Sequence, residues 1–410
     1  MPFSQAEIAE EQTHFANVIQ TFKHYAAYSL SANNRRRKDF FTLPRADQEL
    51  LSSLGYKENI AKADRAIMAN ADFLNQIVAD PEIFGHDLDS EDVGYSEEIH
   101  TILSFASHDH IHGSHSHSHS HSHDEPRASQ GHGGPGKQKR HRPTDFDIDK
   151  LRSTLKQFVR DWSEEVARVC YAPMREALLQ HFSDIPPEER HNFRVLVPGA
   201  GLGRLSWDVA NLGFACQGNE FSHYMLLPHS SSSTGATDSI DQHTIYPYVH
   251  SFSNLPNSAA MLRPISIPDV MPSSLPQGSS FSLVAGDFEE IYGADDNQDE
   301  PQGGKWDAIL TCFFIDTVRQ EHRELPPHHP PILAPGGVWI NLGPLLWHFE
   351  NNSTNDPSIE LNLEEVKALV RKIGFEISNE RTIDTTYTNN AQSMLGYVYH
   401  AAFWTATKRI

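Results

Sequence analysis

The sequence VLVPGAGLGR, residues 195–204, joins a short apolar run to a glycine-rich turn and to the first residues of a helix. Apolar runs of this length that end in glycine are typical of buried strands in parallel sheets. Gly199, Gly201 and Gly203 allow the backbone to take positive φ values and to approach a ligand closely. The stretch therefore predicts an α/β fold with a ligand at the carboxyl end of this strand.

The spacing of the glycines separates two kinds of nucleoside site. The dinucleotide fingerprint G-x-G-x-x-G would place its third glycine at position 204, which is Arg204 here, so a nicotinamide-dependent oxidoreductase is disfavoured. The G-x-G-x-G form is instead similar to that of methyltransferases. Glu220 ends the next predicted strand, where its carboxylate can accept hydrogen bonds from both ribose hydroxyls. Together they predict nucleoside binding, with a purely structural turn as the alternative.

The rest of the chain supplies the pattern of such a fold. Short apolar runs alternate with helical stretches after residue 182, which predicts a mostly parallel sheet with crossover helices. One long amphipathic helix is expected from Phe146 to Phe182, and helices at Ala46–Leu54 and Ala61–Val78. The expected strands are Arg194–Pro198, Phe214–Asn219, Phe281–Ala285, Trp306–Cys312, Gly337–Leu342, Phe375–Thr382 and Leu395–Thr405.

Three parts are expected along the chain: a helical region at 1–106, a His-rich insertion at 107–143 and a catalytic domain at 144–410. The His-rich segment cannot bury a core, so it is expected to be disordered. Its imidazoles could capture transition metals, but nothing fixes a coordination geometry, and no metal site is expected. The Ser- and Pro-rich stretch 229–280 is expected to pack near the site or to cap it.

The composition narrows the partners of the protein. The net charge of −21 would repel a phosphate backbone, which makes nucleic acid a poor substrate. The basic run Arg35–Lys38 is interpreted as a solvated loop. Three cysteines, an odd number, build neither a disulfide framework nor a CxxC zinc site. Without a signal-like start or a run of the ~20 apolar residues that a membrane span needs, the expected location is the cytosol, and also the nucleus.

Further candidates for ligand binding flank the predicted sheet. Asp287 and Phe288 follow the third strand, where the carboxylate could take an adenine amino group and the ring could flank the base. A helix N-cap with a core phenylalanine is the alternative. Arg160 could hold a methionine carboxylate, with Gln157 one turn earlier on the same helix face. A solvated helix face is the alternative for this pair.

Six segments together resemble the carnosine N-methyltransferase family, and they extend from about residue 150 to the C-terminus. They are LKQFVRDWS (155–163), VLVPGAGLGRL (195–205), CQGNEFS (216–222), AGDFEEIY (285–292), CFFIDT (312–317) and GGVWINLGPLLWHF (336–349). The resemblance implies a Rossmann-like class I methyltransferase with a seven-stranded, mostly parallel sheet. It also implies S-adenosylmethionine as methyl donor, carnosine and related histidine dipeptides as substrates, and a homodimer.

The resemblance also implies roles for single residues. Contacts with S-adenosylmethionine are implied for Gln157, Arg160, Gly199, Glu220, Asp287, Phe288 and Cys312, beside Gly201 and Gly203 of the same turn. The substrate imidazole and the dipeptide ends are implied to lie among Asp316, His348, Tyr397 and Tyr399. The chain departs from the family by its His-rich insertion and by a longer Ser-rich segment after the Glu220 region.

Simpler roles remain open for the substrate group. His348 lies between two aromatic residues and could be a core histidine. Tyr397 and Tyr399 are spaced to point to one face of a strand, and their rings could serve packing alone. Asp316 lies just beyond the fourth strand, where its carboxylate could accept the N–H of the distal imidazole nitrogen, leaving the proximal nitrogen to attack. Asp316 is therefore the candidate catalytic residue.

Two other functions stay open at this point. The first is a histidine N-methyltransferase that acts on another dipeptide or on a protein through the same pocket. The second is a metal-binding protein built on the His-rich tract, with an inert Rossmann-like part. Deleting residues 107–143 separates the two classes, because methyl transfer would survive the deletion only in an enzyme.

Overall fold

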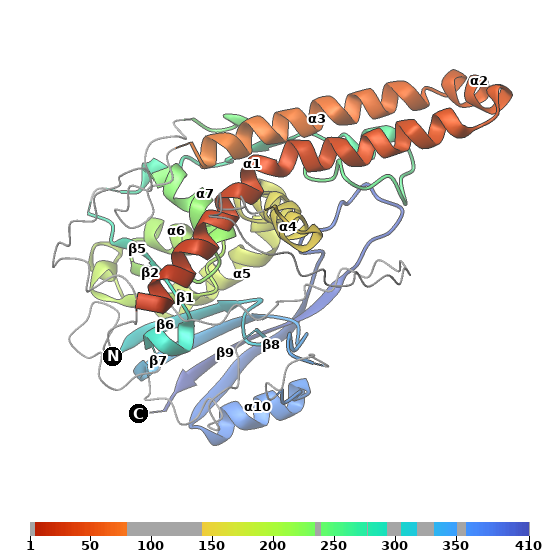
Figure 1. Ribbon diagram of the computed structural model, residues 1–410. Coiled ribbons are helices and arrows are strands. Elements are labelled where there is room, and N and C mark those ends of the chain that lie inside the picture. The colour runs from red at the N-terminus through yellow and green to blue at the C-terminus, as the bar shows by residue number, and fades with distance from the viewer. Residues whose placement is uncertain are drawn as a thin grey trace.

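The computed structural model describes residues 5–79, 142–233, 239–276, 278–292, 305–317, 332–350 and 358–409. Almost all of the His-rich segment 107–143 lies outside the described residues. Seven strands form one sheet in the order β5-β2-β1-β6-β7-β9-β8, in which β9 runs in the opposite direction to the other six strands (Figure 1). The strands are β1 (Arg194–Pro198), β2 (Ala215–Glu220), β5 (Phe281–Ala285), β6 (Trp306–Cys312), β7 (Leu333–Gly343), β8 (Phe375–Thr385) and β9 (Tyr399–Lys408).

The centre of the sheet is buried on both faces. Val195 and Val197 of β1 pack against helices α5 (Glu164–His181) and α6 (Arg204–Asn211), whereas Leu196 points to the other face and packs near α9 (Phe288–Tyr292). Helix α10 (Leu363–Lys372) covers the β8–β9 end. Because both faces of the central strands are covered, the carboxyl edge of the parallel strands remains the place for a ligand.

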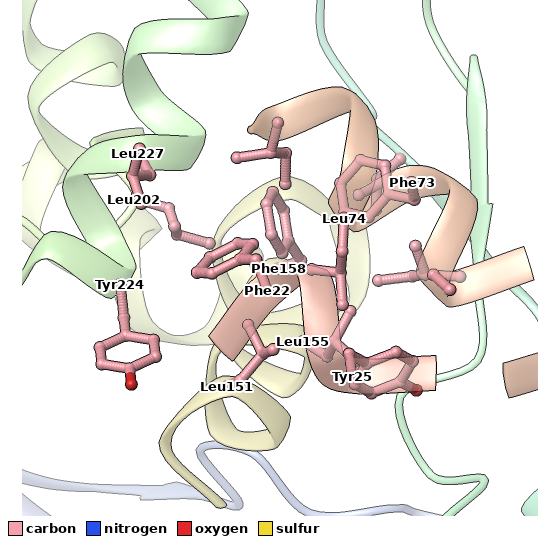
Figure 2. Packing of buried hydrophobic residues seen from close by; sticks show 14 of the residues in the cluster. Phe22, Tyr25, Phe73, Leu74, Leu151, Leu155, Phe158, Leu202, Tyr224 and Leu227 are labelled. Carbon is pink, nitrogen blue, oxygen red and sulfur yellow. The ribbon is translucent and has the colours of Figure 1, made fainter. Parts of the chain in front are cut away.

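The N-terminal helices belong to the same folded body. Helices α1 (Gln5–Thr42) and α3 (Tyr56–Ile77) form a long hairpin with α2 (Arg45–Ser53) at its far end (Figure 1). Aromatic and aliphatic side chains of α1 and α3 pack with those of α4 (Asp145–Trp162) and α7 (His223–Ser233), as Figure 2 shows. No helix in the described part of the chain is long and apolar enough to cross a membrane.

The described part of the stretch 229–280 packs against helices α3 and α4. Its described part contains a two-stranded antiparallel sheet of β3 (His243–Ile245) and β4 (Ile265–Ile267), helix α8 (Ser258–Met261) and the short 3-10 helix η3 (Pro272–Ser274). Asn70 of α3 donates a hydrogen bond to the Tyr246 carbonyl at 3.0 Å and accepts one from the Tyr246 N–H at 2.7 Å. The insertion is therefore seated on the N-terminal helices.

The single helix predicted from Phe146 to Phe182 is wrong. The chain forms two helices, α4 and α5, which are separated by Ser163 in an extended conformation with φ −122° and ψ 150°. The Ser163 hydroxyl donates to the Val159 carbonyl at 2.5 Å, and the Trp162 carbonyl accepts the Asp269 N–H at 3.0 Å. A serine hydroxyl competes for backbone groups in this way, and it ends the helix despite the continuing apolar pattern.

A second 3-10 helix, η2 (Pro187–Asn192), precedes β1.

Two smaller predictions also differ from the structure. The basic run Arg35–Lys38 lies within helix α1 and is not a loop, and the Arg36 guanidinium lies 4.0 Å from the centre of the Phe252 ring. Arg37 forms an ion pair with Asp64 of α3. The last strand begins at Tyr399 and not at Leu395, because residues 386–398 form a loop that contacts the insertion.

Candidate active site

The glycine-rich turn after β1 is shaped by its neighbours. Gly199, Gly201 and Gly203 have φ values of 63°, 58° and 83°. A Cβ atom on Gly201 would lie 2.6 Å from Nη2 of Arg160, and one on Gly199 would lie 2.5 Å from the Phe314 ring. Only glycine fits these positions, so the turn brings its backbone N–H groups to the carboxyl edge of the sheet.

Glu220 connects the turn to the end of β2. Its carboxylate is buried and accepts hydrogen bonds from the N–H groups of Gly201 at 2.8 Å, Phe221 at 3.0 Å and Ser222 at 2.9 Å. Burial raises the pKa of Glu220, and these donors lower it in part. A carboxylate offers about four acceptor positions. Three of these positions are occupied. About one position therefore remains, which is enough for one ribose hydroxyl and not for both.

Arg160 is held at the turn by partners that the sequence did not reveal. Its Nε and Nη2 donate to the two oxygens of Asp161 at 2.5 and 2.9 Å, and Nη1 donates to the Tyr387 hydroxyl. Asp161 also accepts the Tyr171 hydroxyl at 2.5 Å and the Leu202 N–H at 3.1 Å. Asp161 follows Arg160 in the same motif, but its inward position depends on the exact phase of α4.

The other predicted donor contacts lie around this centre. Gln157 is half-buried one turn before Arg160, and its amide makes no hydrogen bond to another described residue. One oxygen of Asp287 caps α9 by accepting the Glu289 N–H at 2.8 Å, as the N-cap alternative expected. The Phe288 ring lies 5.4 Å from that of Phe314 and is half-buried.

An aromatic cluster continues from Arg160 across the sheet edge. The Tyr387 ring stacks on Phe313 at 4.4 Å, and Phe313 meets the Tyr399 ring edge-on at 5.6 Å. Burial raises the pKa of Tyr387 to about 12, so its hydroxyl stays protonated. Burial also raises the pKa of the Cys312 thiol well above its ordinary value. A neutral thiol at this edge supplies contact area and is no nucleophile.

Asp316 lies at the far side of this cluster and is almost completely buried. Its Oδ2 accepts the Leu346 N–H at 2.7 Å, and its backbone carbonyl accepts the His348 N–H at 3.1 Å. Burial raises the pKa of Asp316, while its hydrogen bonds and the nearby His348 lower it in part. The charge of Asp316 contributes in turn to the raised pKa of Tyr399, after burial. The turn after β7 therefore fixes this carboxylate.

The structure brings most predicted residues together, but two lie differently. The expectation that Tyr397 and Tyr399 share one face of a strand is wrong, because β9 begins at Tyr399 and Tyr397 is 52% exposed in the preceding loop. His348 is exposed and is not the core histidine considered above. Among the described residues, no group of three or more His, Cys, Asp or Glu side chains could hold a metal ion.

The fold and the site together define a class of protein. One reversed strand next to the edge of a parallel sheet, and a glycine turn that faces an acidic residue at the end of β2, are typical of a Rossmann-like class I methyltransferase. The carnosine N-methyltransferase family profile matches residues 137–410. The chain belongs to the carnosine N-methyltransferase family.

Individual relatives match either nearly the whole chain or about two thirds of it. The carnosine N-methyltransferase of Mus musculus is 38% identical over 406 residues, which cover 97% of this chain and 86% of that protein. The carnosine N-methyltransferase of Schizosaccharomyces pombe is 42% identical over 269 residues, covering 63% of this chain and 70% of the relative. Among solved structures, the magnesium protoporphyrin IX methyltransferase of Synechocystis aligns with 13% identity and a TM-score of 0.33, covering 65% of this chain and 90% of that one.

Proposed function

We propose that this chain transfers the methyl group of S-adenosylmethionine to Nδ1 of the carnosine imidazole, giving anserine and S-adenosylhomocysteine. Membership of the family supports the dipeptide substrate. The observation that carries the proposal is the placement of a buried carboxylate, Asp316, across a shared aromatic cluster from the glycine turn. An acceptor ring and a methyl donor can meet between these two features.

The donor half has groups suited to both ends of S-adenosylmethionine. The close approach of Arg160 to Gly201 forms a cradle that an added Cβ would fill. Glu220 would take a ribose hydroxyl, and Asp287 and Phe288 would meet the adenine. Gln157 and the remaining N–H groups of Arg160 would hold the amino-acid end. When bound, the donor supplies an electrophilic methyl group on a positively charged sulfur.

Asp316 would decide which imidazole nitrogen reacts. Imidazole has an unperturbed pKa of about 6.5, so at pH 7 one ring nitrogen already carries a free lone pair. The Leu346 N–H and the backbone N–H of Asp316 occupy part of its carboxylate, which leaves acceptor positions for the Nε2–H of the substrate. Nδ1 then faces the donor. The fixed carboxylate also stabilises the positive charge that develops on the ring and can take the proton afterwards.

The neighbouring aromatic rings would also stabilise the positive charge that develops on the imidazole ring. Phe313 and Tyr399 lie between Arg160 and Asp316, beside a Tyr387 ring that is stacked on Phe313 and has the Arg160 guanidinium 4.9 Å from its centre. The faces of aromatic rings attract a cation. Because positive charge moves from sulfur to the imidazole, these rings can stabilise it along the whole path. His348 would orient the polar ends of the dipeptide from the exposed side.

The test is a reaction with methyl-labelled S-adenosylmethionine and carnosine. Mass spectrometry should detect labelled methylcarnosine, and two-dimensional NMR should place the methyl group on Nδ1. A panel of homocarnosine, free histidine and a histidine peptide tests substrate choice, and carnosine should react fastest. Methylation at Nε2, or a faster reaction with the peptide, would contradict the proposal. A variant without residues 107–143 should keep its activity.

We further propose that the protein is a homodimer, as the family resemblance implies. Large apolar side chains near the far end of the N-terminal hairpin support this: Phe41 is 64% exposed, Leu50 60% and Leu54 71%. Grouped exposed apolar residues of this kind mark association surfaces. Sedimentation should find a dimer for the wild type and a monomer for Leu54→Asp. The control Ile359→Asp, an exposed apolar residue shortly before α10 and outside the N-terminal hairpin, should stay dimeric.

A further inference from the structure

Asp161 is a buried carboxylate in the donor half that the proposed reaction does not use. Its Oδ1 accepts Nε of Arg160 at 2.5 Å and the Tyr171 hydroxyl at 2.5 Å. Its Oδ2 accepts Nη2 of Arg160 at 2.9 Å and the Leu202 N–H at 3.1 Å. These four donors occupy the roughly four acceptor positions of a carboxylate. Asp161 therefore acts on a ligand only through Arg160, through the turn and through its charge.

The charge of Asp161 offsets that of Arg160. Burial alone would lower the pKa of Arg160, but the adjacent Asp161 carboxylate, together with Tyr171 and Tyr387, outweighs burial, and the pKa lies well above its ordinary value. The guanidinium stays charged, and its paired carboxylate makes the pair neutral overall. The pair lies directly against the glycine turn, since an added Gly201 Cβ would meet Nη2 of Arg160 at 2.6 Å and Oδ2 of Asp161 at 3.3 Å.

The substrate and product of the donor site differ mainly by one charge. S-adenosylmethionine carries a sulfonium, whereas S-adenosylhomocysteine carries a neutral thioether. An unpaired guanidinium beside this site would repel the sulfonium and leave the thioether unaffected. With an effective dielectric constant of about 20, two unit charges roughly 10 Å apart change a binding constant by roughly tenfold.

We propose that Asp161 is a positioning and specificity-determining residue that, by cancelling the charge of Arg160, prevents the donor site from favouring the neutral thioether product over the sulfonium substrate. This inference rests on the proposed methyl transfer from S-adenosylmethionine. The neutral pair lets Arg160 supply directed N–H groups to a carboxylate without placing a net positive charge near the sulfur. The site consequently places no electrostatic penalty on the substrate relative to the product after each turnover.

Calorimetric titration of the full chain with S-adenosylmethionine and with S-adenosylhomocysteine tests this at pH 8 without an acceptor. The measured quantity is the ratio of the two dissociation constants, because effects on the shared parts of the ligands cancel in it. Asp161→Asn should shift the ratio roughly tenfold toward the thioether. Arg160→Gln should shift it in the opposite direction. The double variant should return it to the wild-type value, although both affinities fall.

Tyr171→Phe is the matched control, because it removes one hydrogen bond from Asp161 and leaves its charge in place. Its ratio should equal that of the wild type. If Asp161→Asn fails to fold, Arg160→Gln and the double variant still decide the matter. A ratio that stays constant in every variant overturns the inference and leaves the proposed function intact. A wild-type protein that binds neither ligand overturns the proposed function and the inference with it.

Discussion

The donor half and the acceptor half of the site are built in different ways. In the donor half, Glu220, Arg160 and Asp161 are buried, and backbone N–H groups or neighbouring side chains hold each of them. Among the described candidate residues of the acceptor half, Asp316 alone is buried to this degree, and Tyr397 is 52% exposed. The difference teaches that the cofactor side is preformed by short-range packing, whereas the substrate side depends on loops that come from separate parts of the chain.

The largest expected effect is in the acceptor half. Asp316→Asn should lower kcat at least about 100-fold, because a fixed carboxylate acting on developing charge or a proton contributes roughly this much. The affinity for S-adenosylhomocysteine should remain within about twofold, since the donor half does not contain Asp316. Steady-state kinetics and calorimetry measure the two values. Equal losses in both would show that the halves are not separate.

The same variant has a second readout in stability. Burial raises the pKa of Asp316 in the folded state. The protonated Asp316 therefore stabilises the fold, fully so below the unfolded pKa of about 3.9. This stabilisation is lost as pH rises through the folded pKa and the side chain ionises. Asp316→Asn should therefore melt at the same or a higher temperature at pH 7, and this advantage should disappear near pH 3.5. Differential scanning fluorimetry across pH measures it. A lower melting temperature at pH 7 would contradict the expected cost of the buried charge.

The next effect probes the donor half. Gly201→Ala should weaken S-adenosylhomocysteine binding about tenfold or more, because the added methyl group meets Arg160 and the φ of 58° is unfavourable for alanine. Gly374→Ala is the matched control, since its φ is 98° and no atom lies within 4 Å of the added Cβ. The control should lose stability but keep its affinity. Similar binding losses in both would attribute the effect to strain alone.

A smaller effect is expected where the acceptor half is held by its loops. The Asn390 side chain donates to the Ala260 carbonyl at 2.8 Å and accepts the Gln392 N–H at 3.1 Å, so it joins the loop before β9 to the insertion. Asn390→Ala removes these bonds, each contributing about 1 kcal/mol. The KM for carnosine should rise about three- to tenfold, with donor affinity unchanged. An unchanged KM would mean that the insertion does not support the substrate side.

The smallest effect compares two tyrosines. Tyr397→Phe should change KM less than about twofold, because the hydroxyl lies on an exposed loop side chain and surface substitutions rarely matter more. Tyr399→Phe should have the larger effect, because Tyr399 lies beside Asp316 and the aromatic cluster. The reverse order in the carnosine kinetics would show that the loop closes over the substrate.

Local pattern predicts the sheet well for a physical reason. Strands β1, β5 and β6 have the predicted ends, because each is a short, mostly apolar run, and Gly199 and Gly286 directly follow β1 and β5. The glycine turn and Glu220 were also correctly brought together, since both lie at the carboxyl ends of neighbouring parallel strands. Contacts between residues at the ends of neighbouring parallel strands can therefore be predicted from the positions of those residues in the sequence.

Contacts made by exact phase or by distant loops do not follow from pattern. At the break the Trp162 carbonyl accepts a hydrogen bond from the N–H of Asp269, which is more than 100 residues away in the sequence. Tyr387 reaches Arg160 from the far end of the sheet, and no periodicity marks it. Asp161 was predictable only as a neighbour of Arg160. The glycine turn and Glu220 therefore follow from the sequence, whereas the partners of Arg160 and the loop that carries Tyr397 needed the structure.

The contact between Asn70 of the N-terminal hairpin and residue 246 of the insertion constrains which substitutions related sequences can accept. Asn70 binds the main-chain N–H and carbonyl of residue 246, together with the Tyr25 hydroxyl. Main-chain atoms are the same in every amino acid apart from the N–H that proline lacks, so no exchange at position 246 can compensate for the loss of Asn70. The selective pressure falls on one side of the contact. A related protein that replaces this asparagine has to hold the hairpin against the insertion through other contacts, because a substitution at position 246 cannot restore these hydrogen bonds.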